Sequence, residues 1–200
     1  MRLDHLAIAA TNLDEGTAWA EEKLGVKLLP GGQHARFATH NTLLGLVDGL
    51  YLEVIAPNPN DTPERPRWFG LDEFSGPPRL VNWICNVPDL DAALADAPPM
   101  ENVPMQRGEL RWDIAVPEGG HLPMGGGFPT LIQWHSSSPP GQSLPASGLR
   151  LTGLTIEHPF AEALADDLTS KLNDDRIDFK VAGTMRLSAT FSGPDGEVHL

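Results

Sequence analysis

The chain has 200 residues, a formal net charge of −13 and an apolar content of 40%. This length suits one large domain or two small ones, and the composition is that of a globular protein with a buried core. The negative charge repels phosphate groups, so neither nucleic acid nor an anionic membrane surface is expected as a partner.

The sequence predicts neither a membrane span nor a signal peptide. No apolar stretch reaches the roughly 18 residues that a bilayer span needs. The N-terminal segment MRLDHLAIAATNLDEG has too little apolar length and too early an acidic residue for a signal peptide. The only cysteine, Cys85, lies in the apolar run LVNWICNV and is interpreted as a small buried hydrophobe. We therefore expect a cytoplasmic protein.

Residues 1–60 predict a first module with the order β-α-β-β-β. Asn12, with Glu15 three residues later, is typical of a helix N-terminus after a short apolar strand. The dipeptide Asp48-Gly49 separates two apolar runs and favours a tight hairpin turn between them. The predicted strands are 3–10, 26–32, 41–47 and 50–57.

Residues 61–78 predict a Pro-rich connection, within a stretch from 57 to 79 that is rich in Pro, Asn and Asp. The pattern of the first module then recurs in residues 79–145, where Asp89 takes the place of Asn12. Residues 146–200 align with the N-terminus and predict a third, partial β-α-β-β module. Three such units are too few and too long for a solenoid and favour one compact α+β unit, in which a mixed sheet curves around a cavity.

Two polar side chains stand out in the apolar strands. Glu53 shares one face of its strand with Tyr51 and Ile55, and His5 shares one face of the first strand with Leu3 and Ala7. Both can therefore point into a cavity without breaking the strand. An unpaired buried carboxylate would cost several kcal/mol, and a metal, a neighbouring base or a bound substrate would remove that cost.

Glu53 and His5 could instead have purely structural roles. Glu53 could form a salt bridge with Arg36, and His5 could be satisfied by a backbone carbonyl.

The segments LDHLAIAATNLDEGTAWAEEKLGV and GGQHARFATHNTLLGLVDGLYLEVIAPNP resemble glyoxalase-like domain proteins of the vicinal-oxygen-chelate (glyoxalase/bleomycin resistance/dioxygenase) superfamily. The resemblance is strong over the first 60 or so residues and weaker in the later modules. It implies a cup-shaped sheet built from paired β-α-β-β-β modules. In members that hold a divalent metal, the ligands come from the first and last strands of each module.

Carried onto this chain, the resemblance places metal ligands at His5, Glu53 and Gln133, with Asn82 at the remaining position. Imidazole and carboxylate ligands suit Zn, Ni, Mn or Fe, whereas neutral amides bind such ions weakly. The single cysteine supplies no further ligand.

The resemblance also marks the polar segments GGQH and THN at the mouth of the cup. We expect His40 to act as a general acid or base, because imidazole can exchange a proton near neutral pH. Asn41 would orient the substrate beside Glu53, and His34, Trp68 and Trp134 would contact it. The alternatives are turn chemistry for His40 and Asn41, a solvated loop position for His34, and core packing for the tryptophans.

Two functions follow from the resemblance. One is an enzyme that binds a small oxygenated metabolite, as a divalent-metal-dependent lyase, isomerase or dioxygenase. The other is a metal-free protein of the same fold that binds or sequesters a small ligand. The partner is a small molecule in both cases, and a monomer and a homodimer both remain open.

Overall fold

The computed structural model describes residues 1–172, 174–194 and 196–200. The first module has the predicted element order. Asn12 caps the helix through a 3.1 Å bond from the Glu15 backbone N–H, and Gly25 ends it in a left-handed conformation. The elements are β1 (Arg2–Ala9), α1 (Leu13–Leu24), β2 (Leu29–His34), η1 (Ala35–Phe37), β3 (Thr39–Gly45) and β4 (Tyr51–Pro57).

The second module repeats this order with a much shorter helix. Asp89 caps that helix, as Asn12 caps α1, by accepting a hydrogen bond from the Ala92 backbone N–H. The elements are β5 (Arg79–Asn86), α2 (Leu90–Leu94), β6 (Glu101–Arg107), β7 (Leu110–Val116), η3 (Pro123–Gly126), β8 (Thr130–Trp134) and α3 (Pro140–Ser143).

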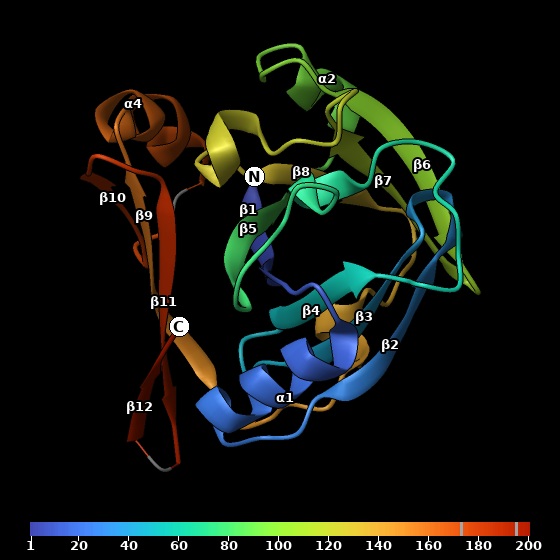
Figure 1. Cartoon of the computed structure of the whole chain (residues 1–200). Helices are drawn as coiled ribbons and strands as arrows, with labels where there is room; N and C mark the ends of the chain where they lie inside the picture. The colour runs from blue at the N-terminus through green and yellow to red at the C-terminus, as the bar shows by residue number, and fades with distance from the viewer. Residues whose placement is uncertain (173, 195) are drawn as a thin grey trace.

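The two modules form one eight-stranded sheet with the order β2-β3-β4-β1-β5-β8-β7-β6. In each module the first strand pairs in parallel with the last, and β1 pairs with β5 in antiparallel fashion where the modules meet. The sheet curls into a half-barrel (Figure 1), which confirms the cup-shaped α+β fold expected from the sequence.

The curled sheet has two differently packed faces. Ala7, Ala9 and Ile84 belong to an inner cluster that lines the cup, whereas Leu6 and Trp83 belong to an outer core under the helices. Cys85 also lies in this outer core, and burial raises the pKa of its thiol well above the usual value. The interpretation of Cys85 as a buried hydrophobe is therefore confirmed.

The C-terminal unit builds a separate four-stranded sheet of order β10-β9-β11-β12. It packs against the outer face of β5, where Phe179 meets Trp83 with ring centroids 6.2 Å apart. Its elements are β9 (Arg150–His158), α4 (Ala161–Leu172), β10 (Ile177–Val181), β11 (Arg186–Gly193) and β12 (Gly196–His199).

This unit repeats the element order of the other modules but not their strand pairing. Its first strand, β9, lies in parallel beside its second strand, β10, with α4 as the crossover. In the first module the corresponding parallel partner is the last strand, β4. The sequence similarity between residues 146–200 and the first module therefore reflects the strand and helix with which both begin. The strands that follow join their sheets in a different order.

The connection 61–78 folds onto the rest of the chain and contains the short helix η2 (Trp68–Gly70). Arg65 forms an ion pair with Glu101, and Arg67 forms one with Asp72. The first pair attaches the connection to β6, and the second lies within the connection.

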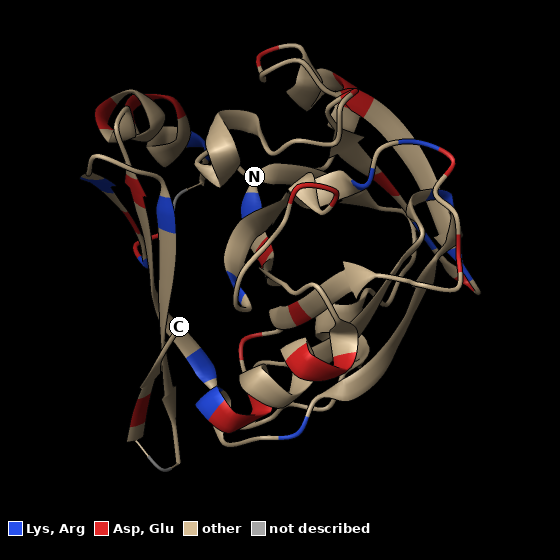
Figure 2. Cartoon of the chain, viewed as in Figure 1, with Lys and Arg blue, Asp and Glu red and all other residues tan. Residues whose placement is uncertain are grey.

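Acidic residues lie on α1, α4 and several loops, with Lys and Arg interspersed (Figure 2). Within the described ranges, no helix is both long enough and apolar enough to cross a membrane.

Candidate functional site

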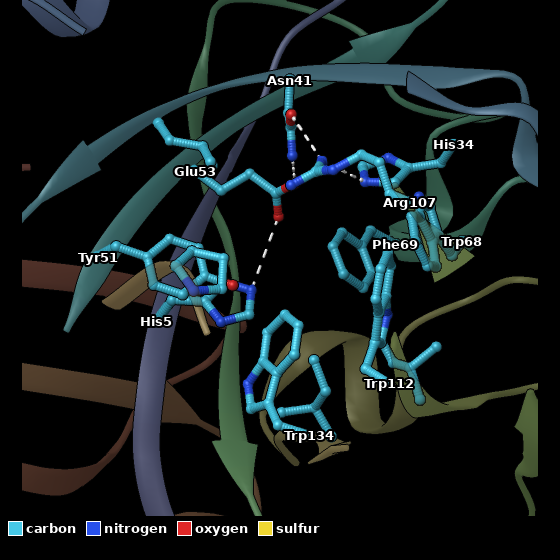
Figure 3. Close-up of a pocket in the computed structure, with 14 residues that line it drawn as sticks. His5, His34, Asn41, Tyr51, Glu53, Trp68, Phe69, Arg107, Trp112 and Trp134 are labelled. Carbon is cyan, nitrogen blue, oxygen red and sulfur yellow. Dashed lines mark hydrogen bonds and ion pairs between the residues drawn. The ribbon is translucent and has the colours of Figure 1, made fainter. Parts of the chain in front are cut away.

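His5 and Glu53 meet on the inner face of the cup. Because β1 and β4 pair with His5 opposite Tyr51 and Ala7 opposite Glu53, the two side chains are diagonal neighbours on one face. His5 Nε2 lies 3.7 Å from Glu53 Oε2. Both residues are buried, with 4% and 5% of their surface exposed. The structure thus brings together the two strand residues that the sequence analysis singled out (Figure 3).

Asn41 holds the Glu53 carboxylate from the other side. Its Nδ2 donates to Glu53 Oε1 over 2.5 Å, and its Oδ1 accepts a 2.7 Å bond from the Gly32 backbone N–H. A Cβ at Gly31 would lie 2.0 Å from Asn41 Oδ1, so the amide can take this position only because residue 31 has no side chain. Gly31 of β2 therefore makes room for the residue that orients Glu53.

Asp4 lies on the opposite side of the His5 ring. His5 Nδ1 is 2.8 Å from Asp4 Oδ1, while Asp4 Oδ2 accepts a 3.1 Å bond from the indole N–H of Trp134. Each nitrogen of His5 therefore faces a carboxylate, with Nδ1 at hydrogen-bond distance from Asp4 and Nε2 3.7 Å from Glu53. A register shift between Leu3 and His5 lets two consecutive residues of β1 reach the same region.

Tyr51 stacks on His5, with ring centroids 4.1 Å apart and an interplanar angle of 15°. Burial raises the pKa of the Tyr51 phenol well above its usual value, and the negative charges of Asp4 and Glu53 add to the effect. The phenol therefore stays protonated and keeps a hydrogen-bond donor at the cavity.

Arg107 reaches the site from the end of β6, in the second module. One of its guanidinium nitrogens lies 3.3 Å from His34 Nε2 and 3.5 Å from Asn41 Oδ1. Among the residues that the structure describes, no carboxylate forms an ion pair with it, and its side chain lines the same cavity as Glu53. The cavity thus contains a cation whose charge is free to attract an anion.

His34 is held neutral beside this cation. Burial lowers its pKa to about 3, and the charges of Arg107 and His40 contribute in the same direction. Its Nε2 therefore accepts from Arg107, which leaves the hydrogen on Nδ1 for the hydroxyl of Thr39, 3.1 Å away. His34 thus positions Arg107 and is a poor candidate for proton transfer near neutral pH.

Aromatic side chains form the remaining wall of the cavity. Trp68 meets His34 edge to face with ring centroids 4.9 Å apart, and Trp112 lies 5.5 Å from Trp134. Phe69 completes this wall (Figure 3). The enclosed space measures only about 30 Å³, so the cavity as it stands has room for little more than a water molecule.

Two predicted site residues lie away from this cavity. Gln133 alternates with Ile132 and Trp134, which face the cup, and its side chain instead accepts a 2.8 Å bond from the Leu90 backbone N–H. His40 is the neighbour of Asn41 in β3 and does not line the cavity. Because successive strand residues point to opposite faces, neither residue supports the metal or acid–base role expected of it.

Asn82 is also unsuited to metal binding. It is fully buried and donates a 2.8 Å hydrogen bond to the hydroxyl of Thr130. In residues 1–172, 174–194 and 196–200, no group of three His, Cys, Asp or Glu side chains lies close enough together to hold a metal ion. The donors that converge, one imidazole and one carboxylate beside a guanidinium, do not fit a transition-metal centre.

Arg107, Asp4, Tyr51 and Trp112 were not among the predicted site residues. Asp4 is adjacent to His5, and simple strand alternation puts it on the other face. The residues next to Arg107 in the sequence do not predict a role in the site, because its position depends on which edges of the sheet meet.

A family model described as a glyoxalase-like domain matches residues 3–172. The chain belongs to this glyoxalase-like domain family, which confirms the resemblance to glyoxalase-like domain proteins. No curated protein sequence matches the chain.

Among solved structures, a hypothetical protein from Staphylococcus aureus shares 14% identity with this chain at a TM-score of 0.67. That match covers 92% of this chain and 87% of the other, and it shows the fold alone. A methylmalonyl-CoA epimerase from Streptomyces coelicolor is 17% identical, with a TM-score of 0.47 and coverage of 68% and 99%. The epimerase from Mycobacterium tuberculosis is 20% identical, with a TM-score of 0.45 and coverage of 66% and 85%. These two weaker likenesses carry no further conclusion.

Proposed function

We propose that the cup binds a small oxygenated anion, such as a 2-oxo acid, and catalyses proton transfer at the carbon beside its carbonyl group. The observation that supports this most is the buried Glu53 carboxylate, which Asn41 holds at 2.5 Å in a cavity that also contains Arg107. A carboxylate and a guanidinium in one cavity match a substrate that carries both an acidic proton and a negative group.

In the proposed reaction Glu53 removes the proton from the substrate carbon. The electrons of the broken C–H bond form a C=C bond, and the carbonyl oxygen becomes the negative oxygen of an enolate. Tyr51 and Arg107 provide hydrogen-bond donors for the oxygens, because the phenol stays protonated and the guanidinium is permanently charged. Return of the proton to the opposite face of that carbon, or to the oxygen, gives an isomer of the substrate, whereas return to the original face regenerates it.

His5 would support this step by its position. Its Nε2 faces Glu53 at 3.7 Å and its Nδ1 faces Asp4 at 2.8 Å, so the imidazole can hold a proton between the two carboxylates. Such a relay would keep Glu53 ready to take or return the substrate proton. His40, which lies outside the cavity, has no part in this mechanism.

Exchange of the methyl protons of pyruvate in D2O, followed by NMR, tests this proposal. We expect the protein to accelerate the exchange and Glu53→Gln to reduce the acceleration by roughly 100-fold or more, because the amide cannot act as a base. Glu64→Gln, at an exposed position in the connection, is the matched control and should leave the rate unchanged. Equal rates in wild type and Glu53→Gln would contradict a catalytic role for Glu53.

A second candidate is a metal-free protein that binds the same class of ligand without turning it over. The aromatic wall and the neutral His34 favour it, since they provide contact surface without reactive groups. Binding of pyruvate without proton exchange would support this candidate.

A metal-dependent lyase, isomerase or dioxygenase would require ligands beyond His5 and Glu53. Elemental analysis of protein purified without chelator, compared with His5→Ala, tests that function. A bound metal in wild type that is lost in the variant would support it.

A further inference from the structure

Phe69 stands between two cavities. Its side chain lines the small cup cavity, and it also lines a second cavity of about 570 Å³. The second space is within the usual size range of small-molecule sites, whereas the cup alone, at about 30 Å³, is far below that range. Phe69 therefore separates the small cup cavity, which contains the reactive side chains, from a second cavity that is large enough for a small molecule.

The second cavity lies between the two sheets and is lined mainly by apolar side chains. These come from α1, β5, β11 and the residue before it, the connection 61–78, the segment that leads into η3, and Leu200 after β12. The apolar lining residues are Trp19, Phe69, Phe74, Leu80, Val81, Leu122, Met185, Leu187 and Leu200. A lining of this kind suits an aliphatic or aromatic group.

The backbone of Phe69 is in a conformation that non-glycine residues rarely adopt, with φ at 59°. The ring stacks on Trp68 with centroids 5.3 Å apart, and the next residue, Gly70, donates a 2.9 Å bond to the Gly120 carbonyl. Strained residues of this type persist where the surrounding structure holds them, and they are concentrated at ligand sites. Because the backbone at residue 70 is anchored, rotation of the Phe69 side chain is the simplest way to join the cavities.

We propose that the two cavities are compartments of one binding site and that Phe69 is the movable wall between them. This inference rests on the proposed function. The ligand is then an oxygenated acid with an apolar tail. Its anionic head lies in the cup near Arg107 and Glu53, and its tail occupies the space between the sheets.

Dissociation constants of pyruvate and 2-oxooctanoate, measured by calorimetry, test this inference. We expect the longer acid to bind at least about 10-fold more tightly, because its five additional carbons leave water for an apolar cavity. Met185→Trp and Leu122→Trp each put a larger side chain into the second cavity and should remove this gain, so that the two acids bind with similar affinity. Val181→Trp, at a position that is 66% exposed, is the matched control.

The wall residue itself is tested by Phe69→Gly. Glycine removes the ring and adopts a positive φ without strain, so the association rate of 2-oxooctanoate should rise. Equal affinities of the two acids in wild type, or a chain-length gain that survives both tryptophan variants, would overturn the two-compartment site. Pyruvate binding without any chain-length gain overturns this inference alone, whereas absence of binding by both acids contradicts the proposed function as well.

Discussion

Arg107 and His34 are 73 positions apart in the sequence, yet their side-chain nitrogens lie 3.3 Å from each other. The contact joins β6 to β2, which are the two edge strands of the eight-stranded sheet. It depends on Gly32, because a Cβ there would lie 2.4 Å from Arg107 Cδ. The edges of the half-barrel therefore meet at the residue that gives the cup its positive charge.

Arg107→Met should weaken the binding of pyruvate by about 10- to 100-fold, because a charge-assisted hydrogen bond to the carboxylate is lost. Binding of the uncharged methyl pyruvate should change much less. Calorimetry with both compounds measures the difference, and Arg111→Met, at an exposed position on β7, is the control. An equal loss for the acid and the ester would show that Arg107 does not select for charge.

The buried His34 should make the fold less stable in acid. Its pKa is lowered from 6.5 to about 3 in the folded chain. The unfolded chain therefore binds a proton at His34 between these values while the folded chain does not, so the free energy of unfolding falls as the pH drops below 6.5. From about pH 7.5 to about pH 5 this contribution amounts to roughly 2 kcal/mol.

Urea unfolding of wild type and His34→Asn at about pH 5 and about pH 7.5 measures this contribution. The decrease in the free energy of unfolding between the two pH values should be smaller in the variant, whatever the variant costs at neutral pH. An identical decrease in both proteins would mean that His34 takes up its proton in the folded state.

Asn41→Asp should destabilise the protein by roughly 2–4 kcal/mol, because it puts a second carboxylate beside a buried one and removes a donor. The donor that is lost is Asn41 Nδ2, which makes the 2.5 Å hydrogen bond to Glu53. Adding Glu53→Gln should recover much of the loss, since the neutral amide can donate to the new carboxylate. Urea unfolding of the two single variants and the double variant gives the coupling energy. Additive losses would contradict a direct interaction between residues 41 and 53.

Gly16→Ala should destabilise the protein by about 1–3 kcal/mol through overpacking. A Cβ at this position would lie 2.5 Å from the Ala10 Cβ and 2.9 Å from Val54 Cγ1. Val54 is the neighbour of Glu53, so the strain acts on the strand that carries the proposed base. Gly183→Ala is the matched control, because no atom lies within 4 Å of its added Cβ. Equal thermal midpoints for the two variants would contradict the close packing of α1 on β4.

Local patterns were sufficient to predict the element order of the first module. The cap at Asn12 and the Asp48-Gly49 turn depend on residues close together in sequence, and both lie where they were expected. The alternation within β1 and within β4 also indicated that His5 and Glu53 can each point into a cavity, and the register of the two strands puts them on one face.

Features that depend on distant contacts were not accessible in this way. Arg107 lies in the site because the edge strands β2 and β6 meet. The sequence around Arg107 gives no indication of its contact with His34. Gln133 was assigned by its place near a strand end, and a difference of one position in a strand exchanges its two faces. The pairing of β9 with β10 also had no signal, since the same element order is compatible with both arrangements.

The four-stranded sheet and the half-barrel share one continuous apolar interior, in which Trp83 contacts residues of both. If either sheet unfolds, the apolar core that it shares with the other sheet becomes exposed to water. Heat or denaturant should therefore unfold the chain in a single transition. The C-terminal quarter of the sequence therefore contributes to the stability of the whole molecule, and a shortened chain that ends before β9 would expose a large apolar surface.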